Sequence, residues 1–139
     1  MFFDSGSMKT FYLLEKSLDA SLIRQQVISD NIANVDTPGF KRTDVTFESQ
    51  MQRALDSENE PRFSVALTHK GHIDFFKPMD YRDVKAKLYL DQWTNYRNDK
   101  NNVDIEKEIS DAVKNSLKYK AMTQSLSTKF KALEMSIQG

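Results

Sequence analysis

Apolar residues recur near the start of the chain at the spacing of an amphipathic helix. Between Met8 and Asn34 they stand three or four residues apart, or sums of these, with charged residues between them. They are Phe11, Leu14, Leu18, Leu22, Ile28 and Ile32. At 1.5 Å per residue, this pattern predicts a helix of roughly 40 Å.

A second and more regular pattern occupies the end of the chain. Its positions keep a 4-3 alternation throughout: Ile105, Ile109, Ala112, Ser116, Tyr119, Thr123, Leu126, Phe130, Leu133 and Ile137. This is a heptad seam, typical of a helix that packs along another helix. Val113 and Leu117 widen the apolar stripe on one flank, so the helix can contact more than one neighbour. Asp104, Glu106 and Glu108 lie near its start, where the helix dipole favours acidic side chains.

The region between the two helices, residues 43–101, is less uniform. Phe47, Met51, Ala54 and Leu55 indicate one short helix. Two segments alternate apolar and polar residues as strands do, and we expect them to form a hairpin. The apolar positions of these segments are Phe63, Val65 and Leu67 in the first, and Val84, Ala86, Leu88 and Leu90 in the second.

The predicted fold class is therefore mainly α, with two long terminal helices in an antiparallel, coiled-coil-like pair and a small irregular insert with short β-strands. Residues 1–42 form the first helix and the corner that follows it. Residues 43–101 form the insert, and residues 102–139 form a C-terminal helix that packs on the first.

The stretch SDNIANVDTPGFKR, residues 29–42, ends the first helix. Pro38 cannot continue a helix, and it pushes Thr37 toward an extended conformation. Asn34 tolerates the left-handed geometry of a helix end, and Pro38-Gly39 suits the centre of a type II turn, in which Gly39 supplies a positive φ. The residues control backbone direction and lack an obvious acid-base pair, so a structural corner is favoured over a catalytic loop.

The helices also indicate an assembly protein. Burying a large apolar side chain contributes roughly 1.5 to 3 kcal/mol, whereas ordering each residue costs about 1 to 2 kcal/mol. One seam cannot offset a helix of some thirty residues when several of its positions are Ser, Thr or Ala. We therefore expect the second flank of the C-terminal helix to contact other subunits.

Composition narrows the function classes. Lys and Arg total 20 and Asp and Glu total 20, so the formal net charge is zero. The chain therefore lacks the positive net charge that would attract nucleic acid. Cysteine is absent, which excludes disulfides, thiolate metal sites and cysteine nucleophiles. The N-terminus lacks the pattern of a signal peptide, and no segment approaches the ~20 apolar residues of a membrane span. We expect a soluble protein that does not use the Sec route.

Candidate chemistry is sparse. His69 and His72 lack converging Cys or acidic partners, and no serine lies in a nucleophile-elbow motif. The glycines are isolated, so no phosphate loop is present. We therefore predict no enzyme, metal or cofactor.

Four other residues could contact a partner. Lys41 and Arg42 are interpreted as a solvated turn edge. For Trp93 and Tyr96, packing against a long helix is favoured over an exposed interaction point.

Two motifs carry a family resemblance. Residues 33–41, ANVDTPGFK, resemble the ANxxTPGFK signature of the bacterial flagellar rod and hook family of axial proteins. The motif and turn residues are Asn31, Ala33, Asn34, Thr37, Pro38, Gly39, Phe40 and Lys41. A second segment, Asn102, Val103 and Asp104 followed by Glu106 and Glu108, resembles the start of the C-terminal helix of rod proteins.

The closing helix narrows the resemblance within the family. Residues 117–122, LKYKAM, and 126–130, LSTKF, are similar to the closing helix of the proximal rod member. FlgC, the sister rod protein, usually carries a YxAN pattern, which is absent after Tyr119. The resemblance covers roughly residues 10–55 and 101–137.

The resemblance implies a structural rod subunit of the flagellar basal body that assembles with copies of itself and carries motor torque. Implied partners are FlgC and further rod subunits, the adaptor FliE, the base ring and the flagellar type III export apparatus. The implied location is the rod within the periplasm, reached without a cleaved signal peptide. The alternatives are another axial subunit such as FlgC, and a cytoplasmic coiled-coil adaptor or export chaperone.

Overall fold

The computed structural model describes residues 6–59, 79–94 and 97–138. Three α-helices dominate this part of the chain: α1 (Gly6–Ala33), α2 (Glu48–Asn59) and α3 (Ile105–Gln138). Two short strands, β1 (Thr43–Thr46) and β2 (Lys87–Leu90), and a 3-10 turn, η1 (Tyr81–Asp83), complete it. None of the helices within the described ranges combines the length and apolar character needed to span a bilayer.

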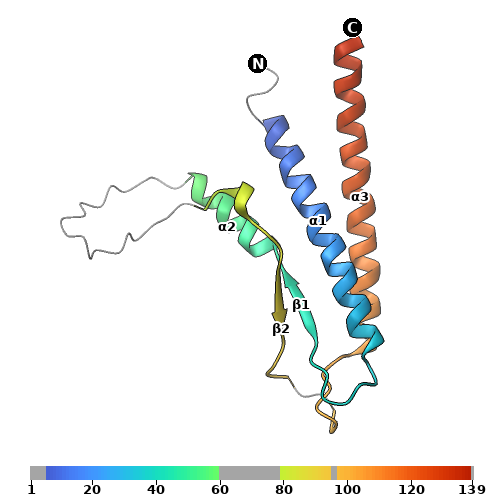
Figure 1. Ribbon diagram of the computed structural model, residues 1–139. Helices are drawn as coiled ribbons and strands as arrows, with labels where there is room; N and C mark the ends of the chain where they lie inside the picture. The colour runs from blue at the N-terminus through green and yellow to red at the C-terminus, as the bar shows by residue number, and fades with distance from the viewer. Residues whose placement is uncertain (1–5, 60–78, 95–96, 139) are drawn as a thin grey trace, which may run out of the picture.

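The two long helices run antiparallel, side by side (Figure 1). The rings of Phe11 and Phe130 lie 5.2 Å apart between their centroids, near the start of α1 and the end of α3. Near the other end, the Asn31 amide donates to the Glu108 carboxylate. The predicted antiparallel pair of terminal helices is confirmed.

The insert contains the predicted short helix and a strand pairing that the sequence analysis did not predict. α2 covers the predicted short helix. β1 pairs antiparallel with β2, with Thr43 opposite Leu90 and Thr46 opposite Lys87. The sequence analysis did not predict β1, because four residues directly after a turn give little alternation. The other predicted strand, around residues 63–67, lies outside the described residues, so the expected hairpin remains a prediction.

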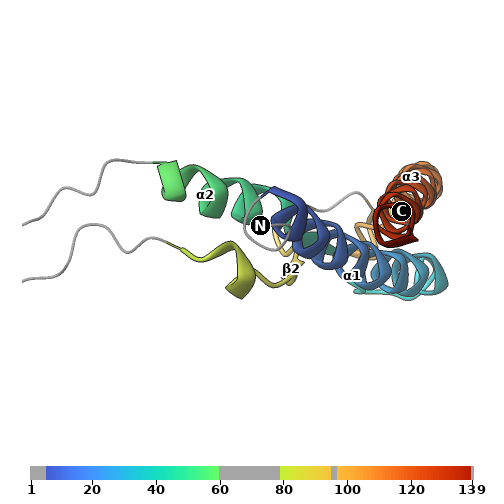
Figure 2. The same ribbon diagram turned by 90° about the horizontal axis from the view of Figure 1, so that it is seen from above.

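The apolar core lies between α1 and the insert, on the side of α1 away from α3. Seen from above, α1 separates α2 and β2 from α3 (Figure 2). The buried cluster consists of Ala20, Phe47, Met51, Ala54, Tyr81 and Val84. Lys9 adds a cation–π contact, with its ammonium 5.1 Å from the centre of the Tyr81 ring. The insert is therefore packed on α1 by the hydrophobic effect.

The face of α3 toward α1 is more polar than a heptad seam suggests. The buried and half-buried positions that keep a 4-3 spacing are Glu108, Ala112, Asn115, Tyr119, Met122, Leu126, Lys129 and Leu133. One row of the predicted seam is present: Ala112, Tyr119, Leu126 and Leu133. The other row is displaced by one residue, so that Glu108 and Asn115 face inward while Ile109 is 52% exposed. The apolar pattern predicted the 4-3 spacing correctly, but it could not predict that polar residues occupy some of the inward positions.

The other predicted packing residues differ in their burial within a single chain. Ile28 is buried, and Phe11, Leu14, Leu18 and Ile32 are half-buried. Exposed residues include Leu22, Ile105, Phe130 and Ile137. Packing of these exposed positions against other subunits remains a prediction.

Candidate functional site

The two motif segments meet where α1 ends and α3 begins, in a cluster of polar side chains that we call the polar clamp. Its members are Asn31, Arg42, Asn101, Asn102 and Glu108. All five are buried, and Glu108 and Asn101 are fully so. Buried polar groups of this kind are stable only when they are paired, so their partners define the geometry of the corner.

An ion pair forms the centre of the clamp. Arg42 Nε donates to Glu108 Oε1 at 2.5 Å, and Arg42 Nη1 donates to Asp44 Oδ2 at 2.9 Å. Burial lowers the pKa of Arg42, but the hydrogen bonds to Glu108 and Asp44 together raise it above its ordinary value. The interpretation of Arg42 as a solvated turn residue was therefore wrong. Its neighbour Lys41 reaches the carbonyl of Thr94, 3.3 Å from Nζ.

Asn31 ties strand β1 to the end of α1. Its Oδ1 accepts from the Thr43 N–H at 3.0 Å, and its Nδ2 donates to the Thr43 carbonyl at 2.8 Å. The side-chain amide thus pairs with one residue as a neighbouring strand would. The same Nδ2 donates to Glu108 Oε2 at 3.0 Å, so a single side chain connects α1, β1 and α3.

Asn101 holds the Thr-Pro-Gly corner. Its Nδ2 lies 2.9 to 3.0 Å from three backbone carbonyls, those of Asn34, Val35 and Thr37. Its Oδ1 accepts from the Val103 N–H at 2.8 Å. One amide therefore closes the corner against the segment that leads into α3.

Asn102 performs a similar role toward the insert. Its Oδ1 accepts from the Arg42 N–H at 2.6 Å, and its Nδ2 donates to the Asp91 carbonyl and to Thr94 Oγ1, both at 2.9 Å. Asp91 follows β2 directly. Because Thr43 lies opposite Leu90, the clamp fixes one end of the two-stranded sheet, the start of β1 and the end of β2, relative to the long helices.

The corner itself has the predicted turn geometry at Gly39. Its φ is +75°, and the Phe40 N–H donates to the Thr37 carbonyl at 3.3 Å. The Gly39 N–H donates across to the Asp99 carbonyl at 2.9 Å. Asn34 tolerates a left-handed conformation but does not adopt one here, since within the described residues the only non-glycine with positive φ is Lys100. Asn34 instead ends the helix through its side chain, which donates to the Asp30 carbonyl at 2.8 Å.

The acidic residues at the start of α3 have separate roles. Asp104 caps the helix, since its Oδ1 accepts from the Glu106 N–H at 3.0 Å. Glu106 is exposed, as expected of a side chain that only complements the dipole. Glu108 is fully buried, so its main role is that of counter-ion to Arg42.

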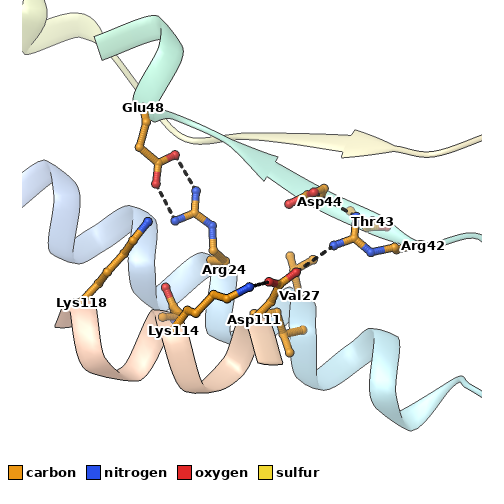
Figure 3. Close-up of a pocket in the computed structure, with 11 residues that line it drawn as sticks. Arg24, Val27, Arg42, Thr43, Asp44, Glu48, Asp111, Lys114 and Lys118 are labelled. Carbon is orange, nitrogen blue, oxygen red and sulfur yellow. Dashed lines mark hydrogen bonds and ion pairs between the residues drawn. The ribbon is translucent and has the colours of Figure 1, made fainter. Parts of the chain in front are cut away.

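A cavity of about 220 Å³ opens beside the clamp, between β1, the start of α2 and the two long helices (Figure 3). Arg24 donates to both carboxylate oxygens of Glu48, at 2.7 and 2.6 Å. This pairing lowers the pKa of Glu48 and raises that of Arg24. Lys114 pairs with Asp111 at 3.3 Å.

Asn115 lies at the edge of this cavity, buried between α1 and α3. Its Nδ2 donates to the Ser21 carbonyl at 2.9 Å, while its Oδ1 has no hydrogen-bond partner within the described part of the chain. Asn115 therefore adds a further polar contact between the long helices.

The chemistry of the cluster is structural. Arg42, Glu108 and the three asparagines use their polar atoms to join backbone segments, which leaves little capacity for proton transfer. Across residues 6–59, 79–94 and 97–138, no group of three or more His, Asp or Glu side chains converges as a metal site would require. His69 and His72 lie outside the described residues.

Sequence reasoning named Asn31, Asn102 and Glu108 but missed Arg42, Asn101 and Asn115. Polar residues at inward heptad positions were the available signal for Asn115 and for the burial of Glu108, because such residues must find partners. No comparable local signal identified Arg42. Its partner Glu108 lies 66 residues away in the sequence.

Comparison with known proteins explains why these motifs occur together. The family model described as "Flagella basal body rod protein" matches residues 11–41, which form most of α1 and the corner. The chain is 39% identical over 126 residues to the flagellar basal body rod protein FlgB of Borrelia hermsii, an alignment that covers 91% of this chain and 93% of the relative. The chain belongs to the FlgB family of flagellar basal body rod proteins.

Other members of the FlgB family agree over similar lengths. The protein from Borreliella burgdorferi is 39% identical, with 85% of this chain and 87% of the relative aligned. The protein from Bacillus subtilis is 33% identical, with 94% of each chain aligned. These alignments extend well beyond the 11–41 segment, so the likeness to the FlgB family includes the insert and α3.

Proposed function

We propose that this FlgB-family chain is a structural subunit of the proximal rod of the bacterial flagellar basal body. Copies assemble through the terminal helices and transmit motor torque. The family relationship supports a rod subunit, and the paired helices supply elements long enough to form a wall. The chain acts by packing and performs no catalysis.

The observation that carries this proposal is an apolar row on α3 that the described part of the chain leaves about half exposed. Its members follow an i, i+4 spacing and are 43%, 52%, 55% and 61% exposed: Ile105, Ile109, Val113 and Leu117. Exposure of four neighbouring aliphatic side chains to solvent is unfavourable for an isolated protein. Such a row is typical of a surface that contacts another protein. Val113 and Leu117 are the residues that the sequence analysis assigned to a second flank.

The polar clamp suits a part that transmits torque. Two elements that are joined only by apolar contacts can shift relative to each other at little cost. Hydrogen bonds and a buried ion pair, by contrast, favour one geometry between the groups that they join. Because Asn31, Arg42 and Glu108 join α1, β1 and α3, the angle between the helix pair and the insert is held by directional contacts. The clamp thus orients the exposed faces of one subunit for its neighbours.

The expected position and partners follow from the same assignment. The chain would lie in the rod within the periplasm, after export by the flagellar type III apparatus without a cleaved signal peptide. Its partners would be FlgC and further rod subunits, FliE and the base ring. The three-part division at residues 42 and 102 would separate the packing helices from the insert.

A paired substitution tests the apolar row. Val113→Asp with Leu117→Asp places two charges at the proposed contact, so we expect loss of motility and basal bodies without a complete rod. Ser125→Asp is the matched control, since Ser125 is an exposed polar position on the same helix, and it should leave motility intact. Normal swimming of the double variant would contradict assembly through this face. Retention of the chain in the cytoplasm of unmodified cells would instead favour an adaptor or export chaperone.

A further inference from the structure

Trp93 is held in solvent just after β2. It is the only tryptophan in the chain, and 86% of its surface is exposed. The sequence analysis expected it to pack against a long helix, and that expectation was wrong. Leu88, Tyr89 and Leu90 in the preceding strand are also at least 45% exposed. Large apolar side chains that are exposed in neighbouring positions of one segment commonly mark a contact surface.

The turn that carries Trp93 is ordered by its own hydrogen bonds. The Asp91 carboxylate accepts from the Trp93 N–H at 3.2 Å and from Thr94 Oγ1 at 2.6 Å. Asn102 of the clamp holds the other side of the turn through the Asp91 carbonyl. An exposed side chain on a fixed backbone loses less conformational freedom on binding than one on a free loop. Trp93 is thus preorganised as a docking side chain.

The same chain has, elsewhere on its surface, a pocket whose size and lining suit a tryptophan side chain. It has a volume of about 280 Å³ and lies between α1, the start of α2 and the middle of α3. Its lining residues are Ser17, Ser21, Phe47, Glu48, Lys118, Ala121 and Met122. This is smaller than the ~300 to 1,000 Å³ of typical small-molecule sites, so it suits one large side chain better than a cofactor.

The lining chemistry fits an indole that lies two residues from a carboxylate, that of Asp91. Phe47 and Met122 offer apolar and thioether contacts to an aromatic ring, and Glu48 offers an acceptor for the indole N–H. The Lys118 ammonium can lie over the ring face or pair with Asp91, which is adjacent to the tryptophan turn. Size, polarity and charge therefore correspond between the two surfaces.

We propose that Trp93 of one copy inserts into this pocket of the next copy. The inference rests on the proposed function, because it specifies a contact by which rod subunits join. Since the two surfaces differ, the contact is heterologous. In a linear series of copies, one end has a free Trp93 and the other end has a free pocket. Heterologous contacts repeat from copy to copy, and they give an open helix where the rotation between copies does not close a ring, which is the arrangement that a rod requires.

The intrinsic fluorescence of the purified chain tests the contact directly, because Trp93 is the only indole. As the protein concentration rises, its emission should shift to shorter wavelength when the ring enters the pocket. Ala121→Phe fills the pocket and should abolish the shift. Trp93→Ala should raise the concentration needed for association about 30-fold, as truncation of a tryptophan hot spot does. Association without a shift, or an undiminished shift in Ala121→Phe, would overturn the proposal.

Cross-linking in cells separates this contact from rod function in general. The chain has no cysteine, so Gln92→Cys and Lys118→Cys introduce single thiols beside the tryptophan and at the pocket rim. Cells that express both variants should yield a cross-linked pair in isolated basal bodies, several-fold more than Gln92→Cys with the control Ser136→Cys at the far end of α3. If both variants are in the rod and the pair is absent, the contact is refuted while the proposed function stands. If neither variant is found in basal bodies, the proposed function fails, and the fluorescence result alone decides the contact.

Discussion

Arg42 and Glu108 form a buried ion pair across 66 residues of sequence, with Nε and Oε1 2.5 Å apart and the Glu108 side chain fully shielded from solvent. The pair joins the end of the Thr-Pro-Gly segment to the first turns of α3. It therefore connects the two segments that carry the family resemblance, at the end of the first and within the second.

Removal of one partner should be far more damaging than removal of both. Glu108→Leu leaves the Arg42 guanidinium buried without its main counter-charge, and we expect a loss of about 3 to 5 kcal/mol in the free energy of unfolding. Arg42→Met combined with Glu108→Leu should recover most of that loss. Urea unfolding followed by circular dichroism measures both.

Asp44→Asn is the matched control for the ion pair. Asp44 also contacts Arg42, but its side chain is 49% exposed, so its replacement should cost at most about 1 kcal/mol. A Glu108→Leu variant as stable as Asp44→Asn would show that the buried pair does not hold the corner.

Asn101→Asp should destabilise the corner by about 2 to 3 kcal/mol. The substitution replaces the Nδ2 donor by an oxygen facing three carbonyls, which then lack their donor in a buried place. Asn98→Asp, at an exposed position of the same loop, should change the thermal midpoint little. Equal midpoints for the two variants would remove the assigned role of Asn101.

Gly39→Ala should lower the free energy of unfolding by about 1 to 2 kcal/mol through backbone conformation alone. Gly39 has a φ of +75°, yet a Cβ at this position would meet no atom within 4 Å. Gly6→Ala is the control, because Gly6 is the first residue of α1 and its Cβ would also meet nothing within 4 Å. Gly6→Ala should not destabilise the chain, and a tolerated Gly39→Ala would argue against a required left-handed residue.

The Arg24–Glu48 pair predicts a pH dependence of stability. Its hydrogen bond with Arg24 lowers the pKa of Glu48 in the folded chain. A lowered folded pKa contributes stability above the unfolded value of about 4.3, and that stability is lost as the pH falls through the folded value. Glu48→Gln lacks this contribution, so wild type should exceed it in urea midpoint above about pH 5. The difference should shrink as the pH approaches about 3, and a constant difference from neutral pH to that value would refute the assignment.

Much of the fold could be predicted from local patterns. The type II turn geometry at Gly39 follows from a Pro-Gly pair, and the two long helices follow from apolar periodicity over some thirty residues each. These features depend on residues that are close together in the sequence, so a single sequence is enough to predict them.

The polar clamp could be predicted only in part, because its contacts join distant segments. Asn101 contacts carbonyls more than sixty residues away, and nothing near Asn101 indicates which backbone it will reach. The second row of the α3 seam was misplaced for a related reason. A hydrophobic pattern selects Ile109 over Glu108, although Glu108 is buried by its bonds to Arg42 and Asn31.

Electron microscopy of basal bodies from cells that lack the gene tests the central claim most directly. If the chain is a proximal rod subunit, these basal bodies should retain the base ring, lack the rod and everything beyond it, and regain both when the wild-type gene is restored. Intact rods in the deletion strain would contradict the assignment.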